Sequence, residues 1–153
     1  GKPSVLGIVT GMVAGLGTIT PASGFVGPMG ALAIGAAAGV ACFFATNYMK
    51  RALHVDDSLD VFPVHGVGGT LGTTLTGVFA AAYFGGVGYP DGVTMGGQVL
   101  VQLTGVLAVA VWSGVVTWVL LKVSDAVVGM RVQPEEETEG LDTVLHNEKG
   151  YNL

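Results

Sequence analysis

The sequence predicts an all-α fold, a polytopic membrane helical bundle with four transmembrane helices. Three observations support this prediction. Charged residues make up only 11% of the 153 residues and the mean hydropathy is +0.65, whereas soluble domains carry about 25% charged residues. The charges are clustered, which leaves long uncharged stretches between them. A segment rich in turn-forming residues divides the first of these stretches.

The uncharged stretches are long enough to cross a bilayer. They run over residues 3–49, 61–90 and 92–121, and one crossing needs about 20 apolar residues. The first stretch accommodates two crossings because proline, glycine and threonine are concentrated at 18–28. We therefore expect helices near 4–19, 29–49, 61–83 and 94–127, within a transmembrane region at 1–128 that is followed by a polar tail at 129–153.

The basic residues predict the orientation of these helices. Neither the 18–28 loop nor the 84–93 loop contains lysine or arginine. With four crossings, all the basic residues fall on the other side: Lys2, Lys50, Arg51, Lys122, Arg131 and Lys149. By the positive-inside rule, both ends of the chain face the cytoplasm, and we expect a multi-pass membrane protein. A very apolar soluble domain is the alternative, but it gives no reason for this distribution of charge.

Other features of the sequence exclude several classes of protein. There is no basic stripe of the kind that binds nucleic acid, and the net charge of -5 comes mainly from the tail. The single cysteine, Cys42, forms no disulfide framework. No motif of a hydrolase, metalloprotease or nucleotide-binding enzyme occurs, so we expect no enzyme, no cofactor and no metal. The first residues lack a signal-peptide pattern, and we interpret residue 1 as an internal boundary.

Glycine, with 26 residues, is the second organising feature of the sequence. It recurs every fourth residue in three rows. Small residues at this spacing allow helix backbones to approach closely in lipid. We expect these rows to pack against neighbouring helices, some of them outside this chain. The rows are Gly7, Gly11 and Gly15; Gly35 and Gly39; and Gly68 and Gly72.

One histidine, His65, lies inside the second uncharged stretch, where the third helix is expected. Three carboxylates at 56–60 precede this span, and His65 follows about a turn and a half later. A titratable side chain within a transmembrane helix is expensive and indicates a functional site. Pro63 belongs in the first turn of a helix, so we expect the helix to start near Asp60, with Asp60 or Ser58 as its cap. From these residues alone, His65 either lines a pore or has a packing role.

The segment 56–69, Asp-Asp-Ser-Leu-Asp-Val-Phe-Pro-Val-His-Gly-Val-Gly-Gly, closely resembles the signature of the ammonium transporter (Amt/Mep/Rh) family. The resemblance extends in order along essentially the whole chain and is strongest to the bacterial Amt branch. It implies the last four helices and cytoplasmic tail of an eleven-helix subunit in the inner (plasma) membrane. The other segments that carry it are 1–7, 19–24, 85–89, 111–116, 129–132 and 139–146.

The resemblance implies a transporter of ammonium or ammonia that assembles as a homotrimer with one pore in each subunit. His65 then corresponds to the second of two pore histidines, which share a hydrogen bond and pass ammonia or relay a proton. A neutral imidazole suits this role because it donates from one nitrogen and accepts at the other. Val61 lines the inner pore, and Asp57 and Asp60 lie at its cytoplasmic mouth.

The resemblance also implies a regulatory tail beneath a PII-type protein that binds the cytoplasmic face. Asn147 departs from the glycine that the family often has after the tail histidine. Two alternatives to transport remain, an ammonium sensor and a fragment that needs a partner chain for the first seven helices. The lack of a signalling domain after the fourth helix favours transport. The residues that match the tail pattern are Gly129, Arg131, Gly140, Asp142 and His146.

Overall fold

The computed structural model of the chain describes residues 4–150, and all regular secondary structure in this range is helical. The chain divides into two units, one ending at Val109 and the other beginning at Ala110. The boundary lies within a long helix, α4 (Met95–Val128). Each unit is described by itself below.

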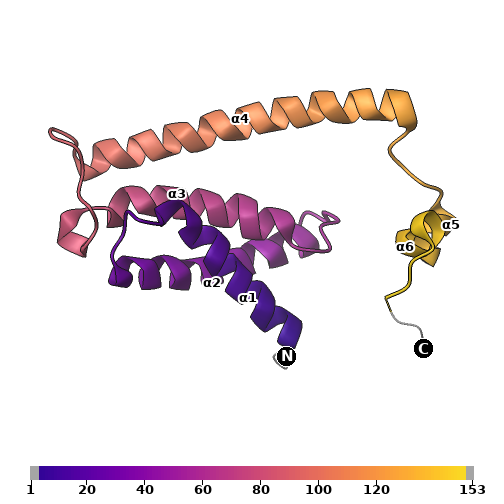
Figure 1. The fold of residues 1–153 in the computed structure, drawn as a ribbon, viewed down its shortest axis with the longest axis horizontal. Helices are drawn as coiled ribbons and strands as arrows, with labels where there is room; N and C mark the ends of the chain where they lie inside the picture. The colour runs from indigo at the N-terminus through magenta and orange to yellow at the C-terminus, as the bar shows by residue number, and fades with distance from the viewer. Residues whose placement is uncertain (1–3, 151–153) are drawn as a thin grey trace. The chain divides into compact units, whose positions relative to one another are not determined.

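Four helical segments make up the body of the chain (Figure 1). The short tail helices are α5 and α6, and two 3₁₀ turns, η1 and η3, lie in the loops. The bounds are α1 (Val5–Ile19), η1 (Thr20–Ala22), α2 (Pro28–Arg51), η2 (Phe62–Val67), α3 (Gly68–Phe79), η3 (Ala82–Phe84), α4 (Met95–Val128), α5 (Pro134–Glu139) and α6 (Leu141–His146).

Three helices of the described chain, rather than the expected four, are long and apolar enough to cross a membrane: Val5–Ala22, Pro28–Arg51 and Met95–Val128. The segment expected as a helix at 61–83 differs in two ways. It opens with the π-helical turn η2, and its α-helical part ends at Phe79. Its continuous α-helix has only 12 residues, fewer than one crossing needs, and glycine, threonine and His65 make the segment less apolar than its neighbours.

Local sequence explains where the first two helices begin and end. The hydroxyl of Ser4 caps α1 by accepting a hydrogen bond of 3.1 Å from the N–H of Gly7. Pro28 occupies the first turn of α2, where its missing N–H removes no hydrogen bond. Lys50 and Arg51 lie in the last turn of α2, where positive charge suits the helix dipole.

The core of the first unit forms where α1, α2 and the η2–α3 segment meet. In Figure 1, α1 crosses α2 obliquely, and both helices contact α3. Ala14 of α1, Cys42 of α2 and Val64 of η2 form one buried cluster. Nearby, Thr18 is fully buried and lies against α3.

One glycine row accounts for the close approach of α3 to α1. A methyl group at Gly68 would lie 2.6 Å from Oγ1 of Thr18, and a methyl group at Gly72 would overlap the carbonyl oxygen of Thr18. Any larger side chain would therefore push the two helices apart. This contact agrees with the packing expected for the row.

Apart from Gly7, where a methyl group would lie 3.1 Å from Oγ of Ser4, the other two glycine rows face open space within the described residues. No atom lies within 4 Å of a methyl group placed at Gly11, Gly15, Gly35 or Gly39. Large apolar side chains on α1 and α2 are exposed as well, among them Leu6 at 76% and Phe44 at 65%. These faces therefore differ from the Gly68–Gly72 row, which is covered by α1.

The loops at the other end of the first unit are tied together by backbone contacts. The N–H of Val87 donates to the carbonyl of Phe25 at 3.1 Å. A methyl group at Gly27 would lie 2.6 Å from the carbonyl oxygen of Gly85. The hydroxyl of Tyr89 donates to the carbonyl of Gly77 at 2.6 Å, so the 85–94 loop is held against the end of α3.

Candidate functional site

A π-helical turn, η2, contains His65. In η2, the N–H of Gly68 donates to the carbonyl of Pro63, five residues back. Pro63 has no N–H of its own and is fully buried. Single π-helical turns within longer helices occur frequently at functional sites. His65 lies at the centre of this turn.

The imidazole of His65 lies against the backbone of α1. A methyl group at Gly17 would lie 3.7 Å from Nδ1 of His65 and 4.0 Å from Cε1. The ring is otherwise exposed in this chain, whereas the preceding Val64 is buried in the core cluster. Val61, four residues before His65, is also 52% exposed. Both side chains therefore remain accessible on the surface of the first unit.

Asp57 fixes the start of this helical segment. Its Oδ1 accepts a hydrogen bond from the N–H of Val61, and its Oδ2 accepts one from the N–H of Phe62, each at 2.9 Å. The bond from Phe62, followed by the bond from Val61, holds the pKa of the Asp57 carboxyl below its ordinary value. A carboxylate at this position also suits the positive end of the helix dipole.

Asp60 has a different role from the one expected. The sequence suggested Asp60 or Ser58 as the cap, and this expectation is wrong because Asp57 provides the accepting oxygens. Asp60 adopts the left-handed conformation, with φ +57°. Its Oδ1 lies 2.6 Å from the ammonium of Lys50. This ion pair links the end of α2 to the start of the π-helical turn.

A cavity of about 510 Å³ lies beside the turn, on the side of Val64. Its inner wall contains the core residues Ala14, Cys42 and Val64. Its polar residues are Ser4, Thr10, Thr46, Asn47, Lys50, Ser58 and Asp60. The cavity therefore extends from the apolar core to the Lys50–Asp60 ion pair, and His65 is not part of its lining.

The tail residues singled out from the sequence lie in the second unit. Gly129 and Gly140 have φ values of +77° and +105°, a conformation that favours glycine. Arg131 forms an ion pair of 2.7 Å with Glu137. Asp142 lies in the first turn of α6 and His146 in its last turn. These residues therefore define the bends and ends of the two tail helices.

Asn147 stands where the family often has glycine, and the structure gives a physical explanation. Asn147 ends α6 in the left-handed conformation, with φ +52°. Glycine is the usual residue at such a helix end, and asparagine is the other residue that adopts this conformation readily. The chain therefore forms a left-handed helix end here without glycine.

Several residues of the site were missed from the sequence. Gly17 stood outside the fourfold glycine rows, so nothing marked it as the neighbour of an imidazole. Lys50 was interpreted only as a marker of topology, although its charge and the nearby carboxylates were a signal for an ion pair.

Comparison with known proteins establishes the family. A sequence model of the Ammonium Transporter Family matches residues 1–151. The chain belongs to the ammonium transporter family. Its members are transporters and not enzymes, and the three long apolar helices agree with a membrane protein of this family.

Individual relatives show how much of a family member the chain represents. An ammonium transporter of Aquifex aeolicus is 50% identical over the whole chain, which covers 36% of that relative. An ammonium transporter of Bacillus subtilis is 40% identical over 98% of the chain, which covers 37% of that relative. A solved structure named Sensor Amt Protein is 30% identical and superposes with a TM-score of 0.83, over 94% of this chain and 35% of that one. The chain thus spans about a third of the length of these proteins.

Proposed function

We propose that this chain is the C-terminal third of a bacterial-type Amt subunit and takes part in translocating ammonium or ammonia across the membrane. The observation that carries the proposal is the position of His65. The imidazole is in the middle of a π-helical turn, directly against the backbone of α1, and exposed on a surface of an otherwise apolar segment. Because η2 and α3 pack against α1 and α2, which are both able to cross a membrane, we infer that His65 lies within the bilayer. An imidazole on an open face at this depth is expected to be functional rather than structural.

The chemistry of imidazole suits this transport. Ammonium must lose its hydration, and usually a proton, to pass a narrow apolar pore. A neutral His65 accepts a proton or hydrogen bond at one nitrogen and donates from the other. A second histidine from the missing part of the subunit would complete the relay. Val61, exposed four residues earlier, would line the inner pore.

The two carboxylates at the expected cytoplasmic mouth keep the segment that carries His65 in position. Asp57 holds the first turn through two backbone hydrogen bonds, and Asp60 ties the same segment to α2 through Lys50. Because these contacts lie within two turns of His65, they hold in place the helical turn that carries its imidazole. Asp57 and Asp60 are thus positioning residues for the pore mouth.

The assembly we propose is a homotrimer of eleven-helix subunits in the inner membrane, with the tail in the cytoplasm. The open glycine rows on α1 and α2, together with their exposed apolar side chains, support further helices against these faces. A PII-type regulatory protein would bind the cytoplasmic face. The tail would take part through Gly129, Arg131, Gly140, Asp142 and His146, whose backbone conformations and ion pair shape its helices.

A sensor is the second candidate, because the solved structure that superposes on the chain is named Sensor Amt Protein. In a sensor the same fold binds ammonium and reports it to a signalling domain. Transport is favoured because the chain also matches relatives named ammonium transporters over its whole length.

One experiment separates transport, sensing and an inactive fragment. The protein is purified from its native membrane, the mass and composition of the assembly are determined, and ammonium-evoked charge movement is recorded in proteoliposomes. A complete assembly that carries ammonium current supports transport. A complete assembly that binds ammonium without current supports sensing, and this chain alone without current supports the fragment.

A further inference from the structure

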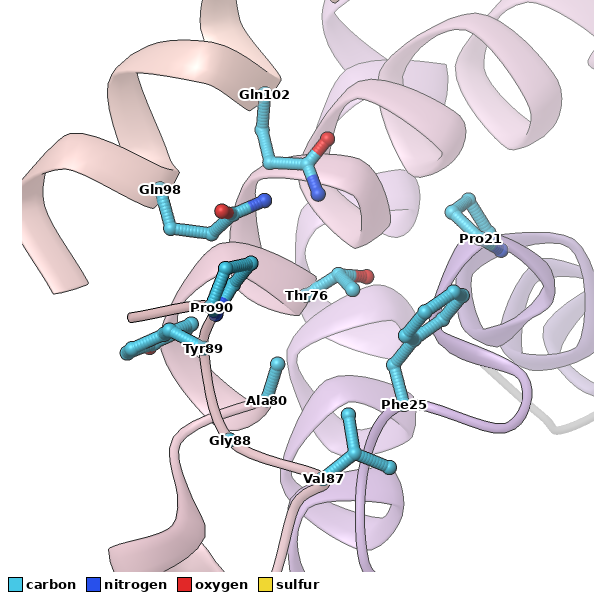
Figure 2. A pocket seen from close by; sticks show the side chains of 10 residues that line it. All are labelled: Pro21, Phe25, Thr76, Ala80, Val87, Gly88, Tyr89, Pro90, Gln98 and Gln102. Atoms are coloured by element: carbon cyan, nitrogen blue, oxygen red, sulfur yellow. The ribbon is translucent and has the colours of Figure 1, made fainter. Parts of the chain in front are cut away.

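A second cavity lies at the opposite end of the first unit from the Lys50–Asp60 pair. It has a volume of about 520 Å³ and lies between the end of α3, the start of α4 and the two tied loops (Figure 2). Gln98 and Gln102 extend from α4 toward Thr76, and Phe25 and Pro21 lie on the other side. The remaining lining residues are Ala80, Val87, Gly88, Tyr89 and Pro90.

The two glutamine amides are the free hydrogen-bond donors of this cavity. Within the described residues, neither amide has a hydrogen bond to another group of the chain. The hydroxyl of Thr76 already donates to the carbonyl of Gly72 at 2.7 Å, and that of Tyr89 donates to Gly77 at 2.6 Å. Both glutamines are half-buried on successive turns of α4 and line the cavity. Each amide offers N–H donors and one acceptor oxygen, so a polar ligand with hydrogen-bond acceptors can bind to both N–H groups at once.

The lining also restricts the chemistry of that ligand. It contains no aspartate, glutamate, lysine, arginine or histidine. A desolvated cation such as ammonium would have no opposite charge here, and a phosphate would meet no basic group. Proline, phenylalanine, alanine and valine side chains form much of the wall, and the volume far exceeds that of one water, about 30 Å³. A neutral ligand with acceptor oxygens and an apolar portion fits both features.

The depth of the glutamines identifies the source of such a ligand. Gln98 and Gln102 lie about 5 and 10 Å from the start of α4 at 1.5 Å per residue. The charged residue Asp91 lies four residues before the start of α4 at Met95, so we infer that the first turns of α4 lie near the interfacial layer. The ester groups of phospholipids lie at this boundary between hydrocarbon and headgroups.

We propose that this cavity binds the glycerol-ester region of a diacyl phospholipid, with the amides of Gln98 and Gln102 donating to the ester carbonyls. The upper methylenes of one acyl chain contact the apolar wall around Phe25 and Val87. The headgroup extends past the 85–94 loop and is not recognised. This loop lacks basic residues, so the leaflet is the outer one under the positive-inside rule.

The test is a count of bound lipids by native mass spectrometry on the purified full-length assembly. The wild-type protein is presented with diester phosphatidylethanolamine, diester phosphatidylglycerol and a diether analogue of the first. We expect one additional tightly held lipid per subunit with either diester lipid, and retention about tenfold weaker with the diether because two hydrogen bonds are lost. Equal retention of the diether, or strong dependence on the headgroup, would overturn the proposal.

Variants then assign the lipid to this cavity. Gln98→Leu combined with Gln102→Leu should weaken retention of the diester lipid about tenfold. Ser113→Leu places the same leucine at an exposed polar position of α4 outside the cavity and should leave retention unchanged. Unchanged retention in the glutamine double variant would contradict the assignment. A second variant, Ala80→Cys, places a thiol in the wall of the cavity, and its crosslinking to another protein segment would also contradict the assignment. The lipid count needs no transport, so it remains decisive whether or not ammonium currents are found.

Discussion

The imidazole of His65 lies directly against the α1 backbone at Gly17, where a methyl group would stand 3.7 Å from Nδ1. No side chain of α1 separates the ring from the helix at this point. The contact fixes one side of the ring, while its other side faces away from the core of the unit. The fold therefore sets the position of the imidazole through a glycine that no sequence motif marked.

The first prediction concerns the space at Gly17. Gly17→Ala should preserve ammonium transport because 3.7 Å is an ordinary van der Waals distance. Gly17→Phe should displace the ring and lower transport at least tenfold with the assembly intact. Ammonium-evoked charge movement and native mass are measured for both variants. Full transport in Gly17→Phe would show that the contact does not control the ring.

The second prediction concerns the cap at Asp57. Asp57→Ala removes the acceptors of two backbone N–H groups and should lower the resistance of the protein to unfolding in mixed detergent. Asp56→Ala is the matched control, since the described structure gives the neighbouring Asp56 no hydrogen bond or ion pair. An equal effect of both substitutions would mean that the carboxylate of Asp57 is not the cap.

The third prediction concerns pH. The folded-state pKa of Asp57 is lowered, so the unfolded chain binds the proton more tightly than the folded one. The associated stabilisation is fully present above the ordinary carboxyl pKa, about 3.9, and is lost as the pH falls through the lower folded value. Unfolding in mixed detergent is measured between about pH 6 and 3. Asp57→Asn should reduce the loss of stability as the pH falls. An unchanged loss would assign the acid sensitivity to other carboxylates.

The fourth prediction concerns the contact between α1 and α3. Gly72→Ala should destabilise the bundle by about 3 kcal/mol, because the added methyl group overlaps the carbonyl oxygen of Thr18 and the backbone cannot yield easily. Gly105→Ala is the control and should not destabilise the bundle, because no described atom lies within 4 Å of a methyl group at this position of α4 and Gly105 belongs to none of the glycine rows. Thermal unfolding in detergent provides the measurement. A Gly72→Ala protein as stable as wild type would show that the helices can separate at no cost.

The sequence predicted those features of the fold that follow from composition. Charge clustering and hydropathy indicate long membrane helices, and the close contact at Gly72 follows from the spacing of small residues. The division of the third segment into π- and α-helix was not predicted, because a π turn depends on which carbonyl accepts each N–H around Pro63. The tail helices α5 and α6 were missed because each has only six residues and gives little periodicity.

The candidate site was predicted in part. His65 was identified because an imidazole in an uncharged stretch is conspicuous. The capping role of Asp57, in place of Asp60 or Ser58, was not foreseen, since Asp57 and Asp60 are both carboxylates a few residues before the helix. Their roles differ because Asp60 takes a left-handed conformation and pairs with Lys50, which is ten residues away in sequence. Such contacts depend on the loop conformation, which residue types do not specify.

The fifth prediction tests the central claim, that His65 is part of the ammonium pathway. In the full-length assembly, His65→Ala should abolish selective ammonium-evoked charge movement, or allow other cations to pass, while the native mass of the assembly equals that of the wild type. His54→Ala is the control, because His54 lies exposed in the loop after α2. Charge movement and selectivity equal to wild type in His65→Ala would remove His65 from the mechanism and contradict the proposed function.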